Sequence, residues 1–133
     1  MRLAAITGSR LHLIEPLGFT LDDAKLRRAG MDYRDRAVVQ VHRDLEAWRI
    51  FAGTSRVFAL SGSGTTRYSD VAFEPGDSFL FGPESVGLPT EVLGAGWISD
   101  VLRIPMQAGV RSLNLANAAS IVIYEAWRQH GFS

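Results

Sequence analysis

Ser112, Asn114 and Asn117 open the longest helix that the sequence predicts, residues 112–129. Ser and Asn side chains at a helix start commonly accept hydrogen bonds from the free N–H groups of the first turn, and Ser112 fits the N-cap position. Capping accounts for one or two of these three residues. Because the positive end of the helix dipole also favours electron-rich groups, we expect the remaining amides to face a ligand.

Turns rich in Gly, Pro or small polar residues follow four of the predicted strands. They are residues 15–18, 61–64, 82–84 and 105–109. In an open parallel sheet the carboxyl ends of the strands lie on one side, where ligands bind, and glycine lets the backbone approach a ligand closely. Any one of these turns could simply reverse the chain. Four together favour a binding crevice.

Short apolar runs alternate with helical patterns along the chain. They predict strands at residues 11–14, 37–42, 56–60, 78–81 and 101–104, and helices or helical turns at residues 22–29, 44–52, 90–93 and 112–129. Gly131 follows the last helix, as expected of a helix C-terminus. The alternation indicates an α/β fold, a parallel sheet with helices on both faces.

The composition is that of an ordinary folded domain, with 133 residues, 47% of them hydrophobic and 21% charged. Lys plus Arg, 14, equal Asp plus Glu, 14, so net charge indicates neither a nucleic-acid nor a membrane partner. Without cysteine, disulfides, thiolate metal sites and a cysteine nucleophile are excluded. No signal peptide or membrane-spanning run is recognised, so we expect one cytoplasmic domain.

The glycines after residues 56–60 do not form a phosphate cradle. Gly62 and Gly64 match the first two glycines of a dinucleotide fingerprint, but Arg67 stands where the third is required. No acidic residue is suitably placed afterwards, and no Walker-type Lys follows. The sequence therefore disfavours a nucleotide-binding domain like that of a small dehydrogenase.

Five segments resemble one class of enzymes. They are LHLIEPLGF (11–19), KLRRAGMDY (25–33), FGPESVGLP (81–89), RIPM (103–106) and RSLNLANAASIVIYEAWRQ (111–129). Together they resemble the SPOUT class of RNA methyltransferases, and within it the small single-domain enzymes that 2′-O-methylate the wobble nucleotide of tRNA, a cytidine or a 5-modified uridine. The resemblance implies a C-terminal trefoil knot, S-adenosyl-L-methionine as cofactor with S-adenosyl-L-homocysteine as product, no metal, and a tRNA substrate.

The resemblance also implies a set of site residues. The cofactor contacts would be Leu60, Gly82, Glu84, Ile104, Met106, Ser112, Leu113 and Asn117. Arg2 falls at the position of an arginine that acts on the ribose oxygen, with Glu84, Ser112 and Asn114 beside it. Because a guanidinium stays protonated, we interpret Arg2 as stabilising the developing alkoxide rather than as a base. Methyl transfer from the sulfonium sulfur to the ribose 2′-oxygen is an in-line displacement, so it depends above all on alignment of this oxygen with the methyl group.

Residues 25–36 contain a cluster of basic side chains that could bind RNA phosphates. The expected RNA contacts are Lys25, Arg27, Arg28, Tyr33 and Arg34. A solvated helix face would have a similar pattern, and Tyr33 could belong to a core instead of stacking on a base. We expect no DNA and no membrane partner. The histidines, His12, His42 and His130, lack ligand spacing and receive no catalytic or metal role.

Ile123, Tyr124 and Trp127 make a large apolar surface on the last helix. Aromatic residues dominate cores and interfaces alike. Relatives in the class are homodimers that use this helix and the first one, so we expect a homodimer.

The class has a strand and an Asn-Thr-Gly-Asn-like loop before the arginine matched by Arg2. The chain starts one residue before Arg2, so we expect a single SPOUT domain, residues 1–133, that is truncated at its N-terminus. Two alternatives to a tRNA methyltransferase stay open. One is a catalytically impaired remnant that binds cofactor or RNA, and the other is a 2′-O-methyltransferase that acts on another RNA.

Overall fold

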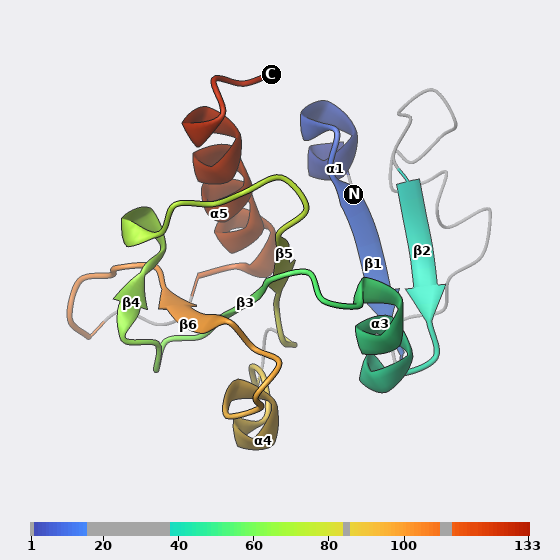
Figure 1. Cartoon of the computed structure of the whole chain (residues 1–133). Coiled ribbons are helices and arrows are strands. Elements are labelled where there is room, and N and C mark those ends of the chain that lie inside the picture. Colours follow the sequence, from blue (N-terminus) through green and yellow to red (C-terminus); the bar gives the residue numbers. More distant parts are fainter. Residues whose placement is uncertain (1, 16–37, 84–85, 110–112) are drawn as a thin grey trace. The chain divides into compact units, whose positions relative to one another are not determined.

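The structure is a computed structural model that describes residues 2–15, 38–83, 86–109 and 113–133 (Figure 1). The chain forms two compact units, Met1–Gly53 and Thr54–Ser133, and each is described by itself. No helix in the described ranges is both long and apolar enough to cross a membrane.

The first unit contains α1 (Arg2–Thr7), β1 (Arg10–Ile14), β2 (Val38–His42) and α3 (Leu45–Ala52). The two strands pair in parallel, with Arg10 opposite Val38 and Ile14 opposite His42. Asp44 is the N-cap of α3, since its Oδ1 accepts the Ala47 N–H at 2.8 Å. The predicted strands 11–14 and 37–42 and the predicted helix 44–52 are confirmed. The predicted helix 22–29 lies outside the described residues, and α1 was not predicted.

A pair of histidines joins the two strands of the first unit. His12 Nδ1 and His42 Nε2 are 2.9 Å apart, and His42 is buried. The Phe51 ring lies 5.3 Å from the His12 ring and 5.5 Å from the His42 ring. Burial, then His42 and the charge of Arg10, lower the pKa of His12 below its usual range. Folding therefore favours the neutral form of His12 relative to the unfolded chain.

The second unit is a four-stranded parallel sheet in the order β4-β6-β3-β5. Its elements are β3 (Val57–Leu60), β4 (Thr66–Arg67), the short 3-10 helix η2 (Tyr68–Asp70), β5 (Ser78–Leu80), α4 (Thr90–Leu93), β6 (Asp100–Arg103) and α5 (Leu115–Gln129). The predicted parallel α/β architecture is confirmed, as are the strands 56–60, 78–81 and 101–104 to within a residue at each end. The helical turn 90–93 is confirmed as well. The short strand β4 was not predicted.

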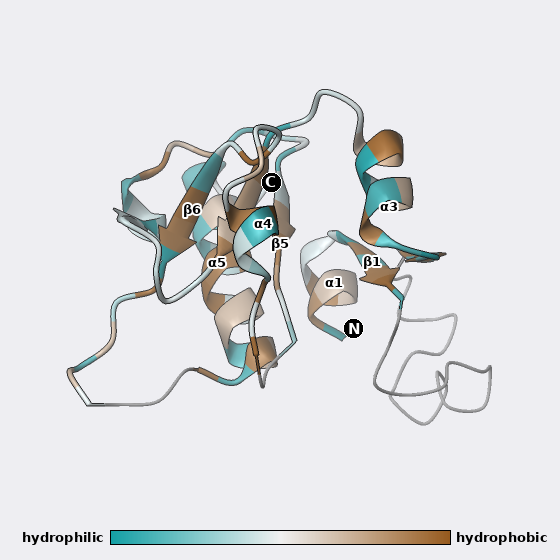
Figure 2. Ribbon diagram, turned by 90° about the horizontal axis from the view of Figure 1, so that it is seen from below, coloured by the Kyte–Doolittle hydropathy of each residue, from teal (hydrophilic) through white to brown (hydrophobic). Residues whose placement is uncertain are grey.

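The core of the second unit is built from aromatic side chains around β3. Phe58, Phe73 and Leu102 are buried together, and Ala126 of α5 packs against them. The Phe73 ring stands edge-on to Phe58 at 5.4 Å and to Phe79 at 5.0 Å, a favourable arrangement for aromatic pairs. Figure 2 shows hydrophobic residues along β5 and recurring along α5.

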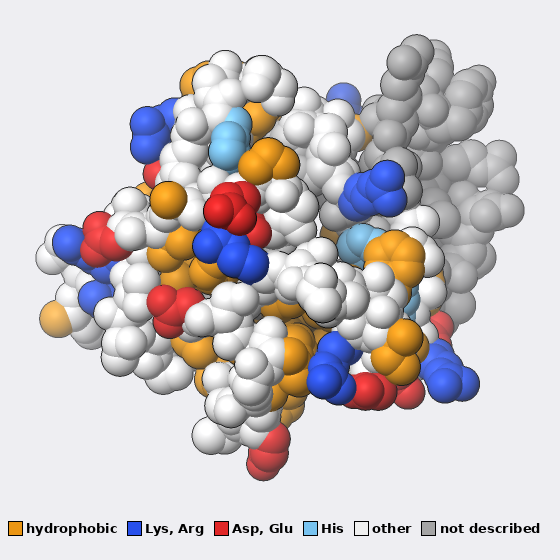
Figure 3. All heavy atoms as spheres, in the orientation of Figure 1, with side chains coloured by type: hydrophobic (Ala, Val, Ile, Leu, Met, Phe, Trp, Pro, Cys, Tyr) orange, Lys and Arg blue, Asp and Glu red, His pale blue; other side chains and the backbone are white. Residues whose placement is uncertain are grey.

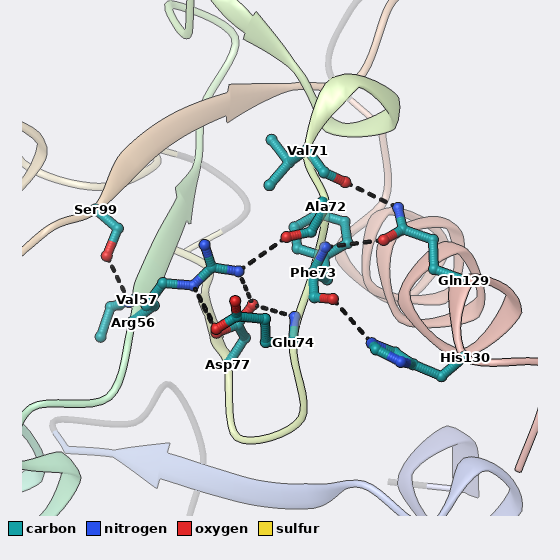
Figure 4. Close-up of polar contacts among 10 residues, drawn as sticks. All are labelled: Arg56, Val57, Val71, Ala72, Phe73, Glu74, Asp77, Ser99, Gln129 and His130. Carbon is teal, nitrogen blue, oxygen red and sulfur yellow. Dashed lines mark hydrogen bonds and ion pairs between the residues drawn. The ribbon is translucent and has the colours of Figure 1, made fainter.

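Two side chains at the end of α5 tie this helix to the segment before β5 (Figure 4). Gln129 accepts the Phe73 N–H at 2.8 Å and donates to the Val71 carbonyl at 2.9 Å. His130 Nε2 donates to the Phe73 carbonyl at 2.8 Å. These bonds satisfy backbone groups of a segment that belongs to no strand, and they fix the position of α5 along the core.

Glycine ends α5 as the sequence predicts. Gly131 adopts φ +68°, its N–H donates to the Arg128 carbonyl, and the Phe132 N–H donates to the Trp127 carbonyl at 2.9 Å. The Phe132 ring packs edge-on against Trp127 at 5.2 Å. This is the Schellman pattern with its usual apolar contact.

The His12–His42 pair makes the first unit sensitive to acid. Because the pKa of His12 is lower in the folded state, the unfolded chain takes up a proton first as pH falls below about 6.5. The stability that neutral His12 contributes is therefore present above that pH and is lost at lower pH. Between about pH 8 and pH 5, His12→Asn should show a smaller drop in the circular-dichroism melting temperature than the wild type. Equal drops in the two proteins would contradict this.

Candidate functional site

The carboxyl ends of three neighbouring strands bring predicted site residues together. β3 lies between β5 and β6, with Ala59 opposite Leu80 and Leu60 opposite Leu102. Leu60, Gly82 and Ile104 therefore follow one another along the same edge of the sheet, and all three are half-buried. The turns in which the sequence predicts a crevice thus lie along one edge of the sheet, and the crevice itself stays a prediction.

Gly82 has no room for a side chain. A Cβ there would lie 2.4 Å from the Gly87 carbonyl carbon and from the Leu88 nitrogen. The turn closes on itself through the Gly87 N–H, which donates to the Pro83 carbonyl at 2.8 Å, and Gly87 takes φ +69°. The motif at 81–89 thus requires glycine at 82 for backbone packing. Glu84, inside this turn, lies outside the described residues.

Gly64 explains the failed dinucleotide fingerprint. A Cβ on Gly64 would lie 2.8 Å from the Leu102 carbonyl carbon and the Val101 oxygen. The glycine therefore lets the turn after β3 pack against β6, and it is buried. Its spacing could have suggested close backbone packing as readily as phosphate binding.

The start of α5 differs from the prediction. Asn114, and not Ser112, is the N-cap, because its Oδ1 accepts the N–H groups of Ala116 at 2.9 Å and Asn117 at 3.3 Å. The helix begins at Leu115, and Ser112 itself lies outside the described residues. Leu113 is half-buried, whereas Asn117 and Met106 are exposed. Asn114 is thus the residue that caps α5.

The residues at the strand ends suit an uncharged planar ring better than a metal or a polyphosphate. Leu60 and Ile104 are both apolar and half-buried, the kind of side chain that packs against an uncharged ring. Within the described residues, no group of three or more His, Asp or Glu side chains could hold a metal ion. The expected absence of a metal stays a prediction.

Arg2 and the predicted RNA contacts lie elsewhere in the chain. Arg2 is the first residue of α1, in the first unit, and is exposed. Lys25, Arg27, Arg28, Tyr33 and Arg34 lie outside the described residues. Their roles stay predictions.

A hollow of about 210 Å³ lies away from the strand ends, lined by Thr54, Ser55, Arg56, Glu74, Pro75, Gly76 and Asp77. Its wall is a structural ion pair (Figure 4). Arg56 donates to both carboxylate oxygens of Asp77, at 3.0 and 2.7 Å, and to the Ala72 carbonyl at 2.9 Å. The Asp77 side chain is only 6% exposed. With the charged groups of Arg56 and Asp77 already paired, the hollow offers little to a charged ligand.

Comparison with known proteins gives consistent matches. The sequence model described as the SpoU rRNA Methylase family matches residues 1–124. A protein of Methylovorus glucosotrophus named tRNA (cytidine(34)-2'-O)-methyltransferase is 49% identical over 133 residues, covering 100% of this chain and 86% of its own length.

Two solved structures share the fold. One, described as "Structural insights into the 2-OH methylation of C/U34 on tRNA", is 46% identical with a TM-score of 0.88, and the match covers 99% of this chain and 86% of the other. An AdoMet-bound rRNA methyltransferase from Sinorhizobium meliloti is 30% identical with a TM-score of 0.73, covering 96% of this chain and 49% of the other.

Replacement of Asn114 separates its capping role from any contact with a ligand. Asn114→Ala should lower the free energy of unfolding by about 1 kcal/mol, because two N–H groups of the first turn lose their acceptor. Asn114→Ser, which can still cap, should stay within a few tenths of a kcal/mol of the wild type. Urea denaturation followed by circular dichroism measures both. Equal losses in the two variants would contradict the capping role.

Proposed function

Because the chain belongs to the SpoU rRNA methylase family, we propose that it methylates the ribose 2′-oxygen of nucleotide 34 of tRNA, a cytidine or a 5-modified uridine. One observation carries the proposal: the 49% identity, across the whole chain, to a relative named for this activity. The adjacent strand ends at Leu60, Gly82 and Ile104 agree with it. The protein is then an S-adenosylmethionine-dependent tRNA (cytidine/uridine-2′-O-)-methyltransferase.

The cofactor site is the crevice at the strand ends. S-adenosylmethionine, when bound, supplies a methyl group on a sulfonium sulfur, which leaves without help from a metal. Leu60 and Ile104 hold the apolar part of the nucleoside, and the backbone at Gly82 approaches it closely. Leu113, Met106 and Asn117 complete the contacts, together with Glu84 and Ser112.

The ribose hydroxyl gives up its proton to solvent water as its oxygen bonds to the methyl carbon and the methyl–sulfur bond breaks, and a positive charge assists this loss. Arg2 donates hydrogen bonds to the ribose oxygen and stabilises the negative charge that develops there. Alignment of this oxygen with the methyl carbon provides the larger share of the rate, because it removes the entropy of bringing two reactants together. Glu84, Ser112 and Asn114 orient the nucleotide. Lys25, Arg27, Arg28, Tyr33 and Arg34 bind the tRNA.

The protein works in the cytoplasm as a homodimer formed through α5. Tyr124 is 41% exposed, and its ring lies 5.7 Å from Trp127. Large, rigid aromatic side chains on one helix suit an interface between two copies of the chain.

Methyl transfer is tested with tRNA transcripts and isotope-labelled S-adenosylmethionine, followed by mass spectrometry of the nucleosides. The wild type should yield 2′-O-methylated ribose at position 34. Arg2→Ala should reduce turnover by at least about a hundredfold, as expected for the loss of one donor to a developing oxyanion, and should leave the cofactor Kd unchanged. Methylation at another position, or binding without methylation, would overturn the proposed function. Equal loss of turnover and cofactor binding would overturn the role of Arg2.

The dimer is tested by light scattering at micromolar concentration. The wild type should show twice the mass of the 14.6 kDa chain, and Tyr124→Glu should shift it towards the monomer because a charge would be buried in the interface. A Glu91→Gln control, on the short helix α4 away from α5, should stay dimeric. A monomeric wild type would contradict the proposal.

A further inference from the structure

Two arginines stand side by side in the sheet of the second unit. In the parallel pairing of β4 with β6, Arg67 lies directly opposite Arg103. Opposite residues of a ladder project from the same face, and like charges at such positions are destabilising. This pairing of like charges does not by itself stabilise the fold.

The two guanidinium groups differ in their partners. Arg67 Nε is 3.0 Å from Asp70 Oδ2, and both side chains are more than half exposed. Arg103 is half-buried, yet within the described part of the chain it makes no ion pair and no side-chain hydrogen bond. The carboxylate at the other end of β6, Asp100, accepts the Val101 N–H instead. Arg103 therefore retains an uncompensated charge and a fork of free N–H donors, which is costly unless a ligand binds them.

Arg103 lies at the carboxyl end of its strand, beside the proposed cofactor site. It is the last residue of β6 and directly precedes Ile104, a residue of the proposed cofactor site. In the described sheet β4 is an edge strand, so the surface beside it is open. Figure 3 shows blue, basic side chains at the left of the second unit, where Figure 1 places β4. A ribose presented to the cofactor carries one phosphate on each side, within a nucleotide of the reacting oxygen.

We propose that Arg103 binds a backbone phosphate next to the ribose that is methylated, with Arg67 reinforcing the positive potential. The proposal rests on the proposed function. Arginine suits the task, since its planar fork binds two phosphate oxygens at once. Asp70 holds Arg67 in place while leaving the guanidinium of Arg103 free for RNA.

The test is the salt dependence of tRNA binding, measured as Kd for an unmodified tRNA transcript between about 50 and 200 mM salt. Arg103→Gln should weaken binding about three- to tenfold at low salt, and should reduce the slope of log affinity against log salt by about 0.7 to 0.9, the value for one lost phosphate contact. Arg103→Lys should keep the slope and only part of the affinity, because an ammonium group cannot bind two oxygens as a fork.

Two further variants secure the interpretation. Arg67→Gln changes an exposed side chain, and it should also reduce the slope, so the test survives if Arg103→Gln does not fold. Arg128→Gln is the matched control, since Arg128 is similarly exposed and paired with a carboxylate, Glu125. Its slope should equal that of the wild type.

Calorimetry with S-adenosylhomocysteine separates the phosphate from the other available anion, the cofactor carboxylate. The proposal requires an unchanged cofactor Kd in Arg103→Gln. A weakened cofactor Kd with an unchanged tRNA slope would overturn it, as would a folded Arg103→Gln whose tRNA slope is unaltered. The readout is binding and not turnover. If the salt slope of the wild type exceeds that of Arg103→Gln but the wild type does not methylate position 34, only the proposed function is defeated.

Discussion

The parallel pairing of β3 with both neighbours is the constraint on which the site depends. Val57, Phe58 and Ala59 are three consecutive buried residues, so β3 is enclosed on both faces, as expected of an interior parallel strand. Its register with β5 and β6 sets which residues follow at the strand ends. A slip of one residue would turn every side chain to the opposite face. Leu60, Gly82 and Ile104 would then no longer line one edge.

Much of this arrangement could be predicted because it follows from local rules. The apolar strands, the turn at 90–93 and the glycine at 131 each depend on neighbouring residues only, and so does the series of glycine-rich turns. The strand β4 could not be predicted, because two residues carry no periodicity and Thr66–Arg67 are extended only through pairing with β6. The start of α5 was misplaced because Ser112 and Asn114 are both good caps. The structure has Asn114 as the cap, and residue type alone does not distinguish the two.

Both ends of α5 are fixed by hydrogen bonds between side chains and backbone. Asn114 binds the first turn, and Gln129 binds Val71 and Phe73 fifty-odd residues earlier in the chain. The second contact was invisible in the sequence because its partners are backbone groups, which every residue carries. The Asn114 bonds stabilise the first turn of the helix itself, whereas the Gln129 bonds anchor the helix to the segment before β5.

The charge distribution explains how a protein with no net charge can act on RNA. Long-range attraction is weak when 14 basic residues balance 14 acidic ones, so affinity must come from a few phosphate contacts made at short range. Most arginines described in the second unit form an ion pair with a neighbour: Arg56 with Asp77, Arg128 with Glu125 and Arg67 with Asp70. Arg103 differs from these three, and it directly precedes Ile104, a residue of the proposed cofactor site. In such a protein the position of one uncompensated charge can determine where the RNA backbone rests, and hence which ribose reaches the methyl group.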